Sequence, residues 1–150
     1  MVDAFDIWLE LKATDEAGHV IFWSGHADDQ GGPVDPSAHF YKSFQIDGEG
    51  NVINKRNAWA ARATMYVNLI PPGSADVAHY LLKIPKNTTG KIHLEANLNY
   101  RKFTSFYSHF AYEGKPDVPA LPIVAVASTS TDLVVGKDSA PAETVSQRDA

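Results

Sequence analysis

A regular alternation of apolar and polar residues constrains the fold more than any other feature of this sequence. It occurs in the stretch "KIHLEANLNYRKF". The apolar residues occupy every second position: Ile92, Leu94, Ala96, Leu98 and Tyr100. Successive side chains of a β-strand point to opposite faces, so a period of two predicts a strand with one face on a core and the other in water.

The same period predicts a second strand over residues 5–12, with the odd-numbered side chains facing the core. A third strand is expected after a hairpin turn at residues 15–18. Further strands are expected at 40–47, 64–70, 77–84 and near 121–135, separated by turns rich in Gly, Pro and Asp. Helical turns fit only 57–63 and 105–114. The pattern predicts an all-β fold, an antiparallel β-sandwich of the immunoglobulin-like type with at most short helical turns.

The chain is predicted to form one domain with a tail. Its 150 residues suffice for a single hydrophobic core, and its composition is that of a globular protein. Residues 136–150 contain one large aliphatic residue, Val145, which is too little apolar area to offset the entropy of ordering them. We therefore expect a β-sandwich domain over residues 1–135 and a linker or flexible tail over 136–150.

Charge and composition exclude several classes of function. The net charge is −5 and the basic residues are scattered, whereas a nucleic-acid-binding protein presents a basic face. The sequence contains no cysteine, which excludes disulfides, thiolate metal sites and covalent attachment of haem within it. It also lacks the apolar run of about 20 residues that a membrane helix needs. None of the common catalytic motifs occurs, so we expect a protein that is not an enzyme.

One acidic loop is a candidate metal site. The segment "HADDQGGPVDPSAH" carries Asp28, Asp29 and Asp35 between His26 and His39. Carboxylates in a glycine-rich loop suit Ca²⁺, although the spacing differs from that of an EF-hand. The alternative is ordinary turn chemistry, in which Asp and Gly shape the loop without binding a metal.

His39 raises a separate question, because it lies between a proline turn and an aromatic strand. One interpretation makes it an axial ligand of a haem supplied from outside this chain. The other makes it a structural residue that anchors the turn through a hydrogen bond from its ring.

An aromatic segment, "NYRKFTSFYSHFAYEG", is the candidate partner or ligand surface. The aromatic and cationic residues that could form this surface are Tyr100, Arg101, Phe103, Tyr107 and Tyr112. Aromatic rings beside cations suit a partner-docking surface or a platform for stacking sugars. The alternative is that the rings close one end of the sandwich as core.

Four stretches of the sequence together resemble one family. They are "VDAFDIWLELKATDEAGHVIFWSG", "VDPSAHFYKSFQIDGEGNVINKRNAWAARA", "VNLIPPGSADVAHYLLKIP" and "LNYRKF". They look like the all-β module of bacterial multihaem c-type cytochrome proteins, where tetratricopeptide repeats often follow. The resemblance runs from about Val2 to Val135 and rests on pattern and spacing, without a catalytic signature.

The resemblance implies a non-catalytic accessory domain that packs on and orients the haem-bearing part of an extracytoplasmic protein, periplasmic or extracellular. The expected partners are that haem domain and, where present, the repeats. Haem c would belong to the parent protein, and no cofactor is expected in this chain apart from the candidate Ca²⁺. The chain would be an excised domain or a free-standing relative. The alternative function is a free-standing β-sandwich that binds carbohydrate or peptide.

Overall fold

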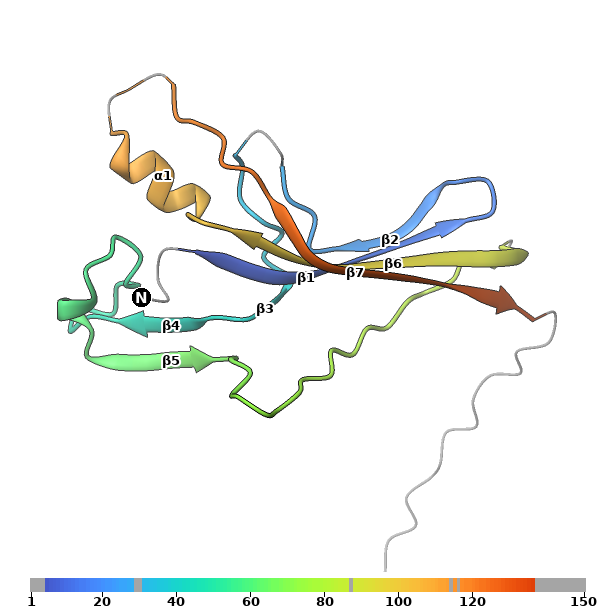
Figure 1. Ribbon diagram of the computed structural model, residues 1–150, viewed down its shortest axis with the longest axis horizontal. Coiled ribbons are helices and arrows are strands. Elements are labelled where there is room, and N and C mark those ends of the chain that lie inside the picture. Colours follow the sequence, from blue (N-terminus) through green and yellow to red (C-terminus); the bar gives the residue numbers. More distant parts are fainter. Residues whose placement is uncertain (1–4, 29–30, 87, 114, 116, 137–150) are drawn as a thin grey trace, which may run out of the picture.

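The computed structural model describes residues 5–28, 31–86, 88–113, 115 and 117–136. They form an antiparallel, sandwich-like all-β fold with one short helix (Figure 1). The elements in chain order are β1 (Asp6–Asp15), β2 (Val20–Ser24), β3 (His39–Phe40), β4 (Ser43–Ile46), a 3₁₀ turn (Ala58–Ala60), β5 (Ala63–Val67), β6 (Gly90–Arg101), α1 (Ser105–Ala111) and β7 (Val124–Val135).

The strands form two sheets of unequal size. The larger has the order β2-β1-β6-β7, and β3 pairs with β1 on the same side as β2. The smaller sheet consists of β4 and β5 alone. In the larger sheet β6 is central, with β1 paired along one edge from Asp6↔Arg101 to Asp15↔Ile92, and β7 along the other. The immunoglobulin-like assignment stays a prediction.

Several local predictions are confirmed. The strands expected at 5–12 and 92–101 are β1 and β6, the turn at 15–18 joins β1 to β2, and a helix occurs within 105–114. The strand expected over 40–47 is interrupted at Tyr41 and Lys42. Its two halves pair with different neighbours, β3 with β1 and β4 with β5.

The prediction of a strand over residues 77–84 is wrong. This segment is extended, but it joins no ladder in the described part of the chain. Its alternation suits a strand, yet both edges of β6 are occupied by β1 and β7. The segment instead passes along one side of the larger sheet between β5 and β6, where the ring of Tyr80 contacts that of Phe22 at 6.1 Å between centroids (Figure 1).

The core includes a residue that was expected to face water. Trp8 alternates with the apolar side chains of β1, yet its exposed fraction is 0%. It forms a cluster with Val34 and Ala38, against which Phe40 and Ile123 pack. The loop that follows β2 folds over this end of the sheet, so β1 is covered on both faces there, whereas the alternation predicted one wet face.

Gly25 allows this loop to approach β1 closely. Its φ is +79°, and a Cβ added there would lie 2.7 Å from the backbone oxygen of Leu9. The approach lets the indole Nε1 of Trp8 donate a hydrogen bond of 2.8 Å to the Gly25 oxygen. A left-handed backbone and a contact this short both require glycine.

The predicted tail lies outside the described residues except for Gly136. In the part of the chain that is described, no helix has the length and apolar character needed to cross a membrane.

Candidate functional site

His39 belongs to a polar network that links β3 to the connection between β5 and β6. Its Nε2 lies 2.7 Å from Oδ2 of Asp76, and its ring meets that of Tyr41 edge-on at 5.1 Å. The hydrogen bond from His39 holds the pKa of the Asp76 carboxyl below its usual value. Nearby, the side-chain amide of Asn68 donates to the backbone oxygen of Phe40 at 2.9 Å. His39 therefore contacts a residue 37 positions away. A role as a haem ligand stays a prediction.

Asp35 of the acidic loop is hydrogen-bonded to groups in and next to the loop. Asp35 accepts hydrogen bonds from the backbone N–H and the hydroxyl of Ser37 and from the N–H of Gly25. The backbone hydrogen bond from Ser37 is the main reason that the pKa of Asp35 is lowered. The ring of His26 packs against Trp23 at 4.2 Å between centroids.

The calcium site stays a prediction, because Asp29 lies outside the described residues. Among the residues that are described, no three His, Asp or Glu side chains are grouped so as to hold a metal ion.

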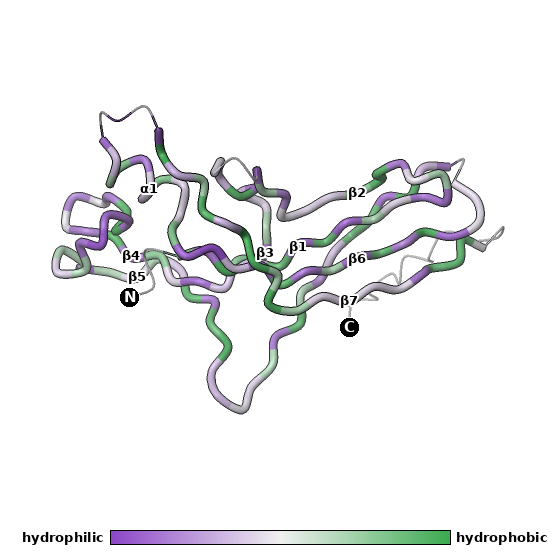
Figure 2. Tube along the Cα trace, turned by 45° about the horizontal axis from the view of Figure 1, so that its top comes forward, coloured by the Kyte–Doolittle hydropathy of each residue, from purple (hydrophilic) through white to green (hydrophobic). Residues whose placement is uncertain are grey.

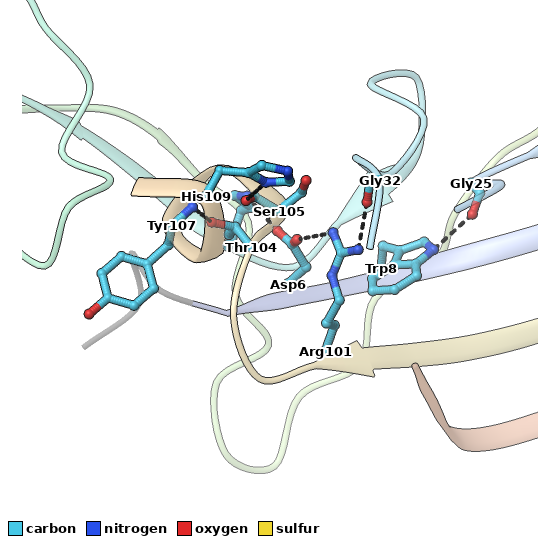
Figure 3. A network of polar contacts seen from close by, with 10 residues as sticks. Asp6, Trp8, Gly25, Gly32, Arg101, Thr104, Ser105, Tyr107 and His109 are labelled. Carbon is cyan, nitrogen blue, oxygen red and sulfur yellow. Dashed lines mark hydrogen bonds and ion pairs between the residues drawn. The ribbon is translucent and has the colours of Figure 1, made fainter. Parts of the chain in front are cut away.

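A buried ionic network lies where β1 and β6 pair at their ends (Figure 3). The Nη2 of Arg101 is 3.1 Å from Oδ2 of Asp6, and its Nη1 donates to the Gly32 oxygen at 2.7 Å. The other carboxylate oxygen, Oδ1, accepts from Nζ of Lys42 at 2.9 Å. The exposed fractions of the Arg101, Asp6 and Lys42 side chains are 2%, 6% and 13%. The expectation that Arg101 belongs to an exposed surface is therefore wrong.

Helix α1 begins four residues after Arg101 and borders this network. The hydroxyl oxygen of Thr104 accepts the N–H of Tyr107 at 3.0 Å and so caps the helix. The His109 ring donates to the Ser105 oxygen at 2.8 Å (Figure 3). Ser105 itself is buried. The cap therefore fixes the first turn of α1 beside the ionic network.

A cavity of about 540 Å³ lies next to the network. Asp6, Lys42 and Arg101 are the charged residues that line it. Its apolar walls come from the loop before β3, from β3 and β4, from the turn after β4 and from α1. They include Val34, Phe40, Phe44, Val52, Ile53 and Phe106. The Nζ of Lys42 lies over the rings of Phe40 and Phe44, at 4.9 and 4.7 Å from their centroids.

The aromatic segment does not form one surface. Tyr100 contacts Phe5 at 6.2 Å between ring centroids, and Phe103 contacts Tyr107 at 5.1 Å. Tyr112 is exposed on the last turn of the helix. The rings thus divide between half-buried packing and an exposed helix face.

Two asparagines of β6, whose amides could hydrogen-bond a sugar beside the rings, lie at a different place. Asn99 donates to Glu10 at 2.7 Å, and with Asn97 it lines a separate cavity of about 400 Å³ beside Trp23. The structure does not bring these amides together with the rings of the aromatic segment.

The sequence pattern did not identify three residues of these networks: Asp6, Lys42 and Asp76. Each contacts a partner 36 or more positions away, and no local motif marks such a pair. A polar residue that interrupts an apolar strand was the one available signal, and Lys42 between Phe40 and Phe44 shows it.

Strand β7 is the outermost strand of the larger sheet, and it is exposed along its length. Every residue from 124 to 134 is exposed, including Val124, Val126, Leu133 and Val134. The connection between β5 and β6 is a long loop that carries further apolar stretches (Figure 2). Its exposed large apolar residues are Leu69, Ile70, Val77, Leu81 and Ile84.

The sequence matches no protein-family model and no curated protein. The fold is similar to part of a solved structure, a penta-haem cytochrome c552 from Thermochromatium tepidum, with a TM-score of 0.55 and 16% sequence identity. The likeness covers 87% of this chain and 31% of that one, so the chain spans about a third of that cytochrome. At this identity the likeness shows a shared fold.

Proposed function

We propose that this chain is a non-catalytic β-sandwich domain that packs on and orients the haem-bearing part of an extracytoplasmic multihaem cytochrome c protein. Two observations support the proposal. The sequence resembles the all-β module of such proteins in pattern and spacing, and the fold is similar to part of a penta-haem cytochrome c552. The extracytoplasmic location follows from the same resemblance.

The observation that carries the proposal is the exposure of β7. This strand has 12 residues and a single charged one, Asp132, and its outer edge pairs with no strand in the described part of the chain. A long, uncharged edge strand invites pairing with other chains, so natural proteins usually cover it or protect it with lysine or proline. A partner that covers β7 accounts for the absence of both residues from the strand.

We expect the docking contact to have the size that is usual between domains of one protein. Interfaces between domains of a chain commonly bury about 600 to 1,500 Å². Exposed valines at one end of β7, Val124 and Val126, and apolar residues at the other, Leu133 and Val134, extend the surface over the whole strand. We assign β7 as the docking strand.

The geometry around the histidines favours a non-catalytic role. His39, which is paired with Asp76, lines a cavity of about 390 Å³ that is also lined by Ser37. A hydrolytic triad requires the serine hydroxyl to donate to the histidine. Here the hydroxyl of Ser37 donates to Asp35 at 2.8 Å, so the serine is directed to the acidic loop.

The test begins with the chain purified after synthesis in cells that mature c-type cytochromes. We expect a colourless, redox-silent protein, and a haem spectrum that survives extensive washing would contradict the proposal. The reading frame around the coding segment gives the second readout. Haem-attachment motifs upstream support the proposal, whereas stop codons on both sides and no cytochrome gene nearby contradict it.

A further inference from the structure

The cavity beside the ionic network holds more positive than negative charge. Among its lining residues, which all belong to the described part of the chain, Lys42 and Arg101 are cations and Asp6 is the single carboxylate. All three side chains are at most 13% exposed. A buried charge without a counter-charge is costly in a low-dielectric environment. The excess of one positive charge therefore favours an anion at this place.

Both cations have hydrogen-bonding capacity that Asp6 does not use. An ammonium group has three donors, and one of those on Lys42 is directed to Asp6. The Nε of Arg101 is buried and has no hydrogen-bond partner within the described residues. Buried donors are nearly always paired, so this unpaired guanidinium nitrogen leaves the positive charge of Arg101 only partly compensated by its protein partners.

The rest of the cavity is mostly apolar, with the polar residues Ser43, Asn54, Tyr66, Thr104 and Ser105 among its lining. The rings of Phe40, Phe44 and Phe106 and the side chains of Val52 and Ile53 line it. Its volume of about 540 Å³ lies within the range of small-molecule sites, which combine apolar walls with a few polar groups. Water-poor walls also strengthen the attraction between a cation and an entering anion.

The geometry points to a binding site for an amphipathic carboxylate, a small molecule with an aliphatic or aromatic body and one carboxylate. The body would occupy the space between the phenylalanine rings, and the carboxylate would meet Lys42 on the side that Asp6 leaves open. This inference does not rest on the proposed function, because it concerns a ligand that the chain binds by itself.

Calorimetric titration of the 150-residue chain with octanoate and with octan-1-ol tests the inference. The two probes share an aliphatic body and differ in charge. We expect saturable binding of octanoate, at least about tenfold tighter than that of octan-1-ol, because hydrogen bonds to charged groups are among the strongest in proteins. Equal affinities, or no binding by either probe, would overturn the inference.

Two variants and a control locate the site. Lys42→Met should remove the preference for octanoate, whereas Lys12→Met should keep it, since Lys12 lies over the ring of Trp23 and does not line this cavity. Val52→Trp should block both probes, because Val52 lines the cavity and is 45% exposed, so a larger ring fits without rearranging the core. If Lys42→Met fails to fold, the binding of the two probes to Val52→Trp is the test of the site. Unchanged binding in Val52→Trp, or a preserved preference in folded Lys42→Met, refutes the site.

Discussion

Arg101 and Asp6 lie 3.1 Å apart although they are 95 positions apart in the sequence. The register between β1 and β6 places them opposite each other at the end of the ladder. The contact joins the first strand of the sheet to β6 and holds two cations, the buried Arg101 and the largely buried Lys42, on one carboxylate. Both residues also line the cavity that lies beside this end of the sheet.

Replacing Asp6 by Asn should destabilise the fold strongly. The substitution leaves Lys42 and Arg101 buried without their counter-charge, and breaking a buried pair in this way costs about 3 to 5 kcal/mol. We expect that loss in the free energy of unfolding, measured by urea denaturation. The control is Glu49→Gln, at an exposed turn, which should change the free energy by no more than about 0.5 kcal/mol. Equal effects of the two substitutions would contradict the assignment.

The pairing of Asp76 with His39 should appear in the titration of Asp76. The hydrogen bond from His39 lowers the pKa of Asp76, so His39→Gln should raise it toward the unperturbed value of about 3.9. Asp132 is the matched control, because its pKa is lowered by His93 and Lys91 instead. Carboxyl ¹³C shifts followed through acid pH give both pKa values in one experiment. His93→Gln should move Asp132 and leave Asp76 unchanged.

The same pairing fixes the sign of a pH effect on stability. A carboxyl whose folded-state pKa is depressed contributes stability that is complete above its unfolded-state pKa, and that contribution is lost as the pH falls through the folded-state pKa. Asp76→Asn should therefore flatten the decline in stability on the acid side of about pH 4. Thermal midpoints of the two proteins should differ at neutral pH and converge in acid. A difference that grows in acid would show the opposite linkage.

Gly25→Ala should cost more stability than the same change at Gly50. Both glycines have positive φ, +79° and +86°, so both substitutions carry the strain of a left-handed backbone. At Gly50 an added Cβ meets nothing within 4 Å, whereas at Gly25 it lies 2.7 Å from the Leu9 oxygen. We expect a further loss of about 2 kcal/mol for Gly25→Ala. Urea denaturation of both variants measures the difference. Similar free energies of unfolding would show that the loop moves away from β1 at little cost and would contradict this prediction.

The docking role of β7 predicts a separation of binding from stability. Val126 is 62% exposed on this strand, and Val126→Lys should leave the free energy of unfolding within about 0.5 kcal/mol. It should weaken association with the separately produced haem-bearing part by at least about tenfold, because it places a charge in the interface core. The matched control is Val20→Lys on β2, an exposed valine on the opposite side of the sheet. Equal effects on association would remove β7 as the docking strand.

The local pattern of the sequence determined which segments can be strands. The alternation in β6, the hairpin between β1 and β2, and the short helix after Arg101 follow from side-chain period, turn residues and capping, which act within a few positions of the chain. An alternating segment becomes a strand only if it pairs with a neighbour. Residues 77–84 were predicted to be a strand, but they pair with none in the described part of the chain.

Tertiary structure alone decided which polar groups meet and which faces are covered. The loop after β2 buries Trp8 on a face that alternation assigns to water. Asp6 meets both Arg101 and Lys42, and His39 meets Asp76, across separations of 36 to 95 positions. Sequence periodicity reports the direction of a side chain relative to its neighbours along the strand. It carries no information on what another part of the chain places opposite that side chain, and the cavity and its charge depend on that placement.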